Sequence, residues 1–263
     1  MISLFRKIRQ KLIQEGKIGN YLKYAIGEIL LVVIGILIAL QINNWNEDRK
    51  ATLVENNFLQ NVLIDLEKDE EKLTYFKKFH TKRIEYLDTL LTYVRNPNKT
   101  MGIEKFGMYV EPLFYSSNPT QYATTFESAK SMGTFNNFKK KEFLKELSQY
   151  YADFTLIENN LYTITRFIES VFEPIMFNLP ESYMTKETGS LVINEEDTKS
   201  FYEKIGSIQD FRNITPDYQK ILRTPKLENY LIGDMGRTYS TLGNISTRLK
   251  KLKQLQEKIK QND

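Results

Sequence analysis

His80 is the only histidine of the chain, and the chain has no cysteine. It lies on the apolar stripe of a predicted helix, where a lone histidine is far more often a packed residue than a catalyst. One histidine and no cysteine exclude a paired Glu-x-x-His di-iron site, an HExxH zinc site and a C-x-x-C zinc site. The sequence also lacks a P-loop, a GxSxG motif and a GxGxxG motif. We therefore expect no catalytic residue, no metal site and no cofactor.

Carboxylates are the remaining groups that could do chemistry, because Asp and Glu total 33. A carboxylate-dependent hydrolase would need several acids clustered in a concave pocket. The densest acidic run alternates with lysines, as a solvated helix face does: Asp65, Glu67, Lys68, Asp69, Glu70, Glu71 and Lys72. The hydrolase is therefore the third of three function classes.

Small residues form a stripe on the last predicted helix: Gly233, Gly236, Ser240, Gly243 and Thr247. Three glycines cost a helix up to about 3 kcal/mol relative to alanine, so an offsetting interaction is expected. Close packing of another helix is the first interpretation, and a hinge or a ligand groove is the second. Aromatic side chains are dense between residues 106 and 138, where core packing and a pocket or partner patch are both open interpretations.

Residues 25–42 read AIGEILLVVIGILIALQI, with Glu28 as the single charge. Eighteen helical residues span roughly 27 Å, close to a hydrocarbon core of about 30 Å. A signal peptide is the competing interpretation, but the sequence from Leu40 to Asn43 offers no small-x-small cleavage site. We predict an uncleaved transmembrane helix over residues 24–44.

The flanks of this segment predict its orientation. Six Lys or Arg residues precede it, whereas the first twenty residues beyond it hold only Arg49 and Lys50. The positive-inside rule then places residues 1–23, a basic amphipathic tail, in the cytoplasm on anionic membrane lipid, and residues 45–263 outside it. Tyr21, Tyr24 and Trp45 fit the interfacial aromatic belts.

The net charge is +4, but residues 1–24 alone carry +5, which leaves −1 for the rest. The large domain therefore shows no charge bias toward nucleic acid.

Glu28, Gly35 and Ala39 lie on one stripe of the predicted transmembrane helix, together with Ile42. Glu28 could reach the headgroups and the small residues could be incidental. The alternative is a contact through this stripe with a second copy or with another membrane protein.

The predicted elements beyond the anchor are helical. No Gly or Pro lies between Trp45 and Arg95, and Leu59, Leu66, Leu73, His80, Leu87 and Val94 recur every seven residues. One helix of about fifty residues is expected, with continuity into the anchor as an open alternative. Two short helices are expected near 103–115 and 120–132, the second ending at Gly133.

Residues 138–178 show the clearest periodicity, in alternating steps of four and three up to a kink or end at Pro174. A polar loop with a possible short strand at LVI follows over 179–196, and helical turns are expected near 197–206 and 217–223. Thr224 and Pro225 predict the start of a last helix that reaches about residue 261. Its expected apolar seam is Leu231, Met235, Leu242, Ile245, Leu249, Leu252 and Ile259. The predicted fold is all-α: one N-terminal transmembrane helix, then an elongated bundle of three long heptad-patterned helices plus several short helices.

Three stretches, FRKIRQKL, YAIGEILLVVIGILIALQINNWNEDRK and SMGTFNNFKKKEFLKELSQYY, resemble a family of uncharacterised single-pass membrane proteins that is common in Bacteroidota. The resemblance implies a bacterial inner-membrane protein with its bulk in the periplasm, and it implies no activity. We expect a non-enzymatic, membrane-anchored helical protein that binds a partner or senses a ligand. The second class is a structural or assembly subunit that acts through its transmembrane helix, with a protein partner or a second copy.

Overall fold

The computed structural model describes residues 18–116, 120–177, 196–209, 211–212 and 217–261. The chain divides into two compact units: unit 1 is Met1–Phe58 with Thr134–Lys139, and unit 2 is Leu59–Gly133 with Lys140–Asp263. The described residues form helices and connecting turns and include no strand, which confirms the all-α class. The proposed strand at LVI lies outside the described residues.

The longest element is α2 (Ile18–Arg95), a single helix of 78 residues. It confirms that the helix after Trp45 is continuous with the apolar segment, as the absence of Gly and Pro allows. Its C-terminal end is held in unit 2 by Arg223, whose guanidinium donates hydrogen bonds to the carbonyl oxygens of Tyr93, Val94 and Asn96. Tyr93 and Val94 lie in the last turn of α2, where the helix supplies no further N–H to its carbonyls, and a cationic donor adds bonds there and complements the helix dipole.

Short helices follow α2 at the expected places. They are α3 (Ile103–Val110), the 3₁₀ turn η1 (Glu111–Phe114), α4 (Thr124–Ser131) and the 3₁₀ turn η2 (Thr134–Asn137). Pro112 in η1 lacks the N–H that a continuing α-helix would need. Gly133 has a φ of 69°, which confirms it as the residue that ends α4.

The periodic stretch 138–178 is divided where one long helix was expected. It forms α5 (Lys141–Ala152), α6 (Phe154–Phe167), the π turn η3 (Ile168–Phe172) and α7 (Glu173–Met176). The break at Asp153 leaves the apolar positions on one face, because Leu147, Phe154 and Ile164 are all buried. The π turn ends two residues before Pro174, whose ring crowds the carbonyl of Ser170 within that turn.

The last elements are α8 (Glu196–Ser207), α9 (Tyr218–Leu222) and α10 (Pro225–Lys260). Thr224 occupies the N-cap position with Pro225 next to it, as expected. The Thr224 hydroxyl does not cap α10, however; it donates to the carbonyl oxygen of Lys220 at 3.2 Å.

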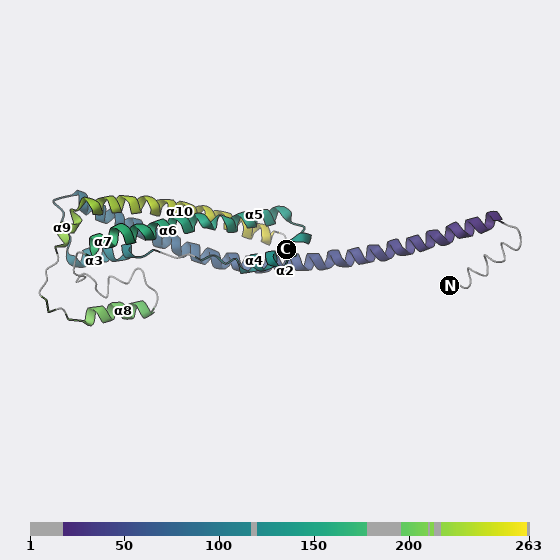
Figure 1. Cartoon of the computed structure of the whole chain (residues 1–263), viewed down its shortest axis with the longest axis horizontal. Helices are drawn as coiled ribbons and strands as arrows, with labels where there is room; N and C mark the ends of the chain where they lie inside the picture. The colour runs from purple at the N-terminus through teal and green to yellow at the C-terminus, as the bar shows by residue number, and fades with distance from the viewer. Residues whose placement is uncertain (1–17, 117–119, 178–195, 210, 213–216, 262–263) are drawn as a thin grey trace. The chain divides into compact units, whose positions relative to one another are not determined.

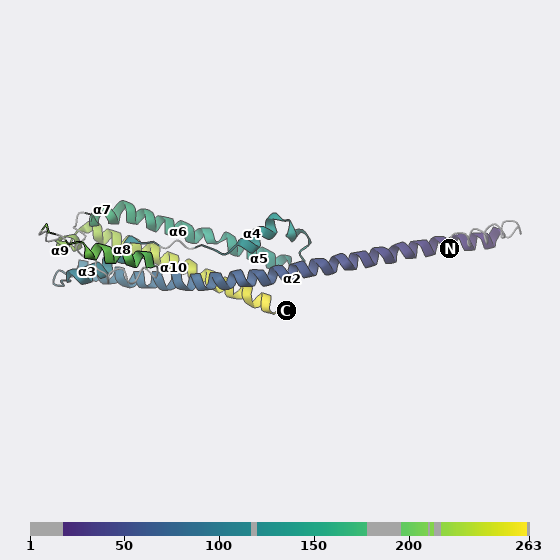
Figure 2. The same cartoon turned by 90° about the horizontal axis from the view of Figure 1, so that it is seen from below.

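In unit 2, α6 and α10 lie side by side in both views (Figure 1 and Figure 2). They run antiparallel, because Asn160 bonds to Ser240 while Phe167, later in α6, stacks on Tyr230, earlier in α10. The buried face of α10 is rotated from the expected seam. Met235, Leu242 and Leu249 are only half-buried, whereas polar residues share the buried face with Leu231, Ile245, Leu252 and Ile259: Asp234, Thr238, Thr241 and Arg248.

Unit 1 contains the apolar part of α2. Among the described residues, α2 is the one helix long and apolar enough to cross a membrane. Its large apolar side chains between Ile29 and Ile42 are all exposed. The segment Thr134–Lys139 packs on the same helix, because the rings of Phe135 and Phe138 each lie 5.3 Å from that of Phe58.

Candidate functional site

Arg83 of α2 is the centre of a buried polar cluster in unit 2. Its guanidinium pairs with Asp234 of α10, with Nη2 2.8 Å and Nε 3.1 Å from Oδ2. It also donates to the carbonyl oxygens of Pro112 at 3.0 Å, Leu113 at 3.1 Å and Tyr115 at 2.7 Å. Arg83 therefore binds the C-terminal carbonyls of η1 and joins three elements at one point.

Aromatic rings close this cluster from solvent. Tyr230 donates from its hydroxyl to Asp234 at 3.3 Å, and its ring stacks on Phe167 and Phe172 with centroids 5.0 and 4.5 Å away. Burial, together with the Asp234 charge, raises the pKa of Tyr230 well above its usual value. Burial opposes the charge of Arg83, but Asp234 and Tyr230 outweigh it, so the pKa of Arg83 is raised. Both side chains of the pair are enclosed.

A second cluster in unit 2 has Asp69 of α2 and Arg248 of α10, 3.3 Å apart. Asp69 also accepts from the Tyr150 hydroxyl at 2.8 Å and the Tyr122 N–H at 2.7 Å. Arg248 lies over the Tyr150 ring, 3.7 Å from its centroid, and donates to the Tyr150 carbonyl and to Gln121. Burial raises the pKa of Asp69, although its hydrogen bonds and Arg248 oppose this.

Asp65 and Asp69 correct the expectation of a solvated acidic face. Both are buried, while Glu67 and Glu71 of the same run are exposed. Asp65 accepts from the N–H of Thr125 at 3.1 Å, in the first turn of α4. A carboxylate at this end satisfies an unbonded N–H and complements the helix dipole. The two acids therefore bind the chain that leads into α4 rather than water.

His80 lies one turn before Arg83 on α2 and is buried, with its ring 5.2 Å from that of Phe79. Burial, followed by the positive charge of Arg83, lowers the pKa of His80 to about 3. The imidazole is therefore neutral at physiological pH. This agrees with the interpretation of His80 as a packed residue.

The sequence analysis did not predict that the four charged residues of these two clusters are buried, although the spacing along α2 indicates it for two of them. Asp69 and Arg83 occupy core positions of α2 in steps of three and four with Leu66, Leu73, His80, Leu87 and Leu90. A charge at a core position of a heptad pattern must find a partner, because an unpaired buried charge is too costly. The partner itself could not be read from the pattern.

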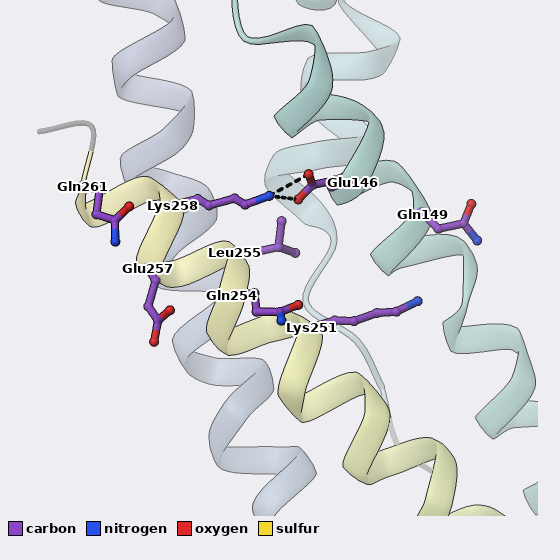
Figure 3. A pocket seen from close by; sticks show the side chains of 8 residues that line it. All are labelled: Glu146, Gln149, Lys251, Gln254, Leu255, Glu257, Lys258 and Gln261. Atoms are coloured by element: carbon purple, nitrogen blue, oxygen red, sulfur yellow. Dashed lines mark hydrogen bonds and ion pairs between the residues drawn. The ribbon is translucent and has the colours of Figure 1, made fainter.

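An open groove of about 570 Å³ lies between α5 and the last turns of α10 (Figure 3). Lys258 crosses it and bonds to both carboxylate oxygens of Glu146, at 2.6 and 2.5 Å. Leu255 points toward the same gap, and the remaining lining is polar. Across the described ranges, no group of three or more His, Cys, Asp or Glu side chains could hold a metal ion.

The predicted anchor residues lie in unit 1. Gly35 and Ala39 are exposed, and among the described residues a β-carbon built on Gly35 would meet no atom within 4 Å beyond its chain neighbours and the adjoining backbone of its own helix. Trp45 is exposed, with the Arg49 guanidinium 5.9 Å from its ring centroid. Glu28 is half-buried. The side chains of Tyr21 and Tyr24 lie outside the described part of the structure.

The predicted small-residue stripe of α10 behaves differently at each position. A β-carbon on Gly233 would lie 2.9 Å from the ring of Phe167, so close packing occurs there. Gly236 and Gly243 are exposed, with no described atom within 4 Å of a β-carbon, and Ser240 accepts from the Asn160 amide at 3.0 Å. Among the three glycines of this stripe, only Gly233 is therefore closely packed against another described side chain.

Three of the eight aromatic residues between 106 and 138 lie in the core of their own unit, and the other five are half-buried. Phe106, Phe126 and Phe138 are buried. Phe106 contacts Tyr218 and Phe126 contacts Tyr151, with centroids 5.4 and 4.8 Å apart. These contacts favour the packing interpretation of this aromatic group.

Comparison with known proteins identifies a family for the chain but no activity. No curated protein and no solved structure matches the chain significantly. The model of a family of unknown function (DUF6090) matches residues 28–171, which is more than half of the chain. The match runs from Glu28 in the apolar segment to the π turn η3. The chain belongs to this family of unknown function, DUF6090.

Proposed function

We propose that the protein is a non-enzymatic protein anchored in the bacterial inner membrane, whose helical domain binds a partner protein in the periplasm. Residues 24–44 span the membrane, residues 1–23 lie in the cytoplasm and residues 45–263 lie in the periplasm. The observation that carries the anchor is the run of exposed apolar side chains on α2. From Ile29 to Ile42 each large apolar side chain is 46–68% exposed, a surface that suits lipid and not water.

The buried acids of unit 2 are engaged by groups of the chain itself. Asp69 and Asp234 are paired with arginines, and Asp69 and Asp65 also accept backbone N–H groups. A catalytic carboxylate must reach a substrate, and these are enclosed by packed rings and helices. The carboxylate-dependent hydrolase therefore receives no support from the buried acids.

The outer face of α10 is the surface that we propose for a protein partner. Ile232 and Tyr239 are exposed there, and Gly236 and Gly243 follow at the same helical spacing. Nothing in the described chain covers either glycine. A partner helix could approach the backbone closely at the glycines and bury the two large side chains.

Two measurements test the anchoring and the orientation, and a third tests the partner surface. The chain should stay in the membrane after an alkaline carbonate wash, and Ser246→Cys should react with an impermeant maleimide in intact spheroplasts. Partners are then sought by purification in mild detergent and mass spectrometry. Tyr239→Ala should lose the bound protein, whereas Lys250→Ala on the same helix should keep it. A chain released by carbonate, or labelled only after lysis, would contradict the proposed anchoring or orientation.

A second candidate is an assembly subunit that works through its transmembrane helix. The open space at Gly35 favours it, because another helix could lie against the stripe of Glu28, Gly35 and Ala39. Gly35→Ile should weaken association in a transmembrane-helix reporter, while Ile34→Leu should not. Exchange of the whole anchor for an unrelated one would abolish function only for this second candidate.

A further inference from the structure

The segment Thr134–Lys139 is attached to α2 just beyond the apolar part of that helix, within unit 1. The N–H of Lys139 donates to Glu55 at 2.7 Å, and its ammonium donates to Thr52 at 3.1 Å. The same ammonium lies 4.0 Å from a carboxylate oxygen of Asp48. With Phe135 and Phe138 packed on Phe58, both ends of the segment are held on the helix.

The depth of this attachment follows from the rise of the helix. Trp45 is the interfacial residue after the apolar run, and Asp48 and Thr52 lie three and seven residues further along α2. At 1.5 Å per residue they are roughly 5 and 11 Å beyond Trp45. The headgroup region is roughly 5 to 8 Å thick on each side of the hydrocarbon core. The ammonium of Lys139, which lies near both residues, is therefore at the outer edge of the headgroups.

The charges at this depth suit a phosphate group. The side chain of Lys139 is 54% exposed. Its ammonium nitrogen lies 4.0 Å from the Asp48 carboxylate, which is the outer limit of an ion pair. The ammonium has three N–H donors, so it can also bind another acceptor. Arg49 lies over the ring of Trp45 with its guanidinium. Lys50 lies at the same level, but it pairs with Glu47 at 3.0 Å and therefore contributes less to the binding of a phosphate group. Arg49 and Lys139 thus flank the point where α2 leaves the bilayer, and the exposed acids Glu47 and Asp48 at the same level compete with lipid phosphate for these cations.

We propose that Thr134–Lys139 is a second membrane contact, in which Lys139 and Arg49 bind the phosphate groups of anionic lipids on the face of the bilayer where α2 emerges. This rests on the proposed anchoring by α2. A single helix can tilt toward any of its sides in a bilayer, whereas a contact with the lipid surface on one side favours tilt toward that side. The segment would therefore set the side toward which α2 tilts.

The absence of cysteine allows a single spin label to test this contact in the full chain. Asn136→Cys places the label on the segment, and Asn57→Cys is the control, twelve residues beyond Trp45 on the same helix. Each chain is reconstituted in vesicles of phosphatidylcholine, or of phosphatidylcholine mixed with phosphatidylglycerol. Accessibility to a neutral nickel chelate then reports how far each label is shielded by headgroups.

We expect the label at residue 136 to be less accessible to the nickel chelate in the anionic vesicles than in phosphatidylcholine alone. The accessibility of the label at residue 57 should be the same in both kinds of vesicle. Lys139→Gln should lower the headgroup-bound fraction about fivefold, the usual effect of one basic residue at an anionic surface. Asp48→Asn should have the opposite effect, because it removes the acid that competes for Lys139.

Equal accessibility of residue 136 in the two vesicles, in a chain that resists carbonate extraction, would overturn this contact and leave the anchoring intact. A chain that carbonate extracts would overturn both. A shift at residue 136 that persists unchanged in Lys139→Gln would assign the contact to other groups and so contradict the role of Lys139.

Discussion

Arg83 on α2 and Asp234 on α10 form a buried ion pair whose charges are reversed relative to the pair of Asp69 and Arg248 on the same two helices. Arg83 follows Asp69 by fourteen residues, and Arg248 follows Asp234 by fourteen residues. Two heptads therefore separate the pairs on each helix. A parallel arrangement, or a slip by two heptads, would place like charges together in the core. The two pairs thus select one direction and one register of α10 against α2.

Removal of one partner of this pair should be costly. Asp234→Ala leaves Arg83 buried without its counter-charge and should lower the free energy of unfolding by about 3 to 5 kcal/mol. Urea unfolding of the full chain in mild detergent, followed by circular dichroism, measures this. Lys82→Ala is the matched control, because Lys82 pairs with Glu85 on the surface and should change stability by less than about 1 kcal/mol. Equal effects of the two variants would contradict the role of the buried pair.

Arg248→Lys should also destabilise the chain, although the positive charge remains. Arg248 donates to Asp69, to Gln121 and to the Tyr150 carbonyl while its plane covers the Tyr150 ring. A lysine ammonium cannot make the planar contact and reach the three acceptors together. We expect a loss of about 1 to 3 kcal/mol in the same unfolding measurement. Lys250→Arg, on the exposed side of α10, should be neutral, and a neutral Arg248→Lys would show that the charge alone suffices.

His80 predicts a pH dependence of stability. Its pKa in the folded chain is about 3, below the usual 6.5, because burial and Arg83 disfavour its charged form. Below pH 6.5 the unfolded chain binds a proton that the folded chain does not, so stability falls as the pH is lowered from 6.5 toward about 3. The slope should approach about 1.4 kcal/mol per pH unit.

The raised pKa of Asp69 acts in the opposite direction, so comparison with a variant at His80 separates the two contributions. Urea midpoints between pH 5 and 8 should decline below about 6.5 in the wild type. His80→Gln should remove most of this decline. A variant whose midpoints follow the wild-type curve would show that another group is responsible.

The glycines of α10 should respond to alanine with opposite signs. Gly233→Ala places a β-carbon 2.9 Å from Phe167, whose ring is held between Tyr230 and Arg237. We expect a loss of about 1 to 3 kcal/mol from overpacking. Gly236→Ala and Gly243→Ala add a β-carbon in open space and should each gain up to about 1 kcal/mol of helix propensity. Thermal unfolding of the three variants decides this, and a stabilised Gly233→Ala would contradict the close approach of Phe167.

The sequence alone determined the elements whose signals are local. An apolar run followed by fifty residues without Gly or Pro predicts a long helix with an anchor, and α2 is one long helix whose apolar part is long enough to cross a membrane. Gly133 and the Thr224–Pro225 pair likewise marked a helix end and a helix start. Such signals depend on backbone preferences and on residues a few positions apart, so they need no knowledge of the fold.

The tertiary structure decided which positions face the core and what satisfies them. A heptad pattern gives a stripe but not its partner, so Met235 was expected where Asp234 is buried. Asp69 could be assigned to a solvated face until Arg248, far away in the sequence, supplied its counter-charge. The site of Lys139 on α2 likewise depends on contacts with Thr52 and Glu55. A buried charge is stable only beside a partner of the right sign, and chain folding alone brings those partners together.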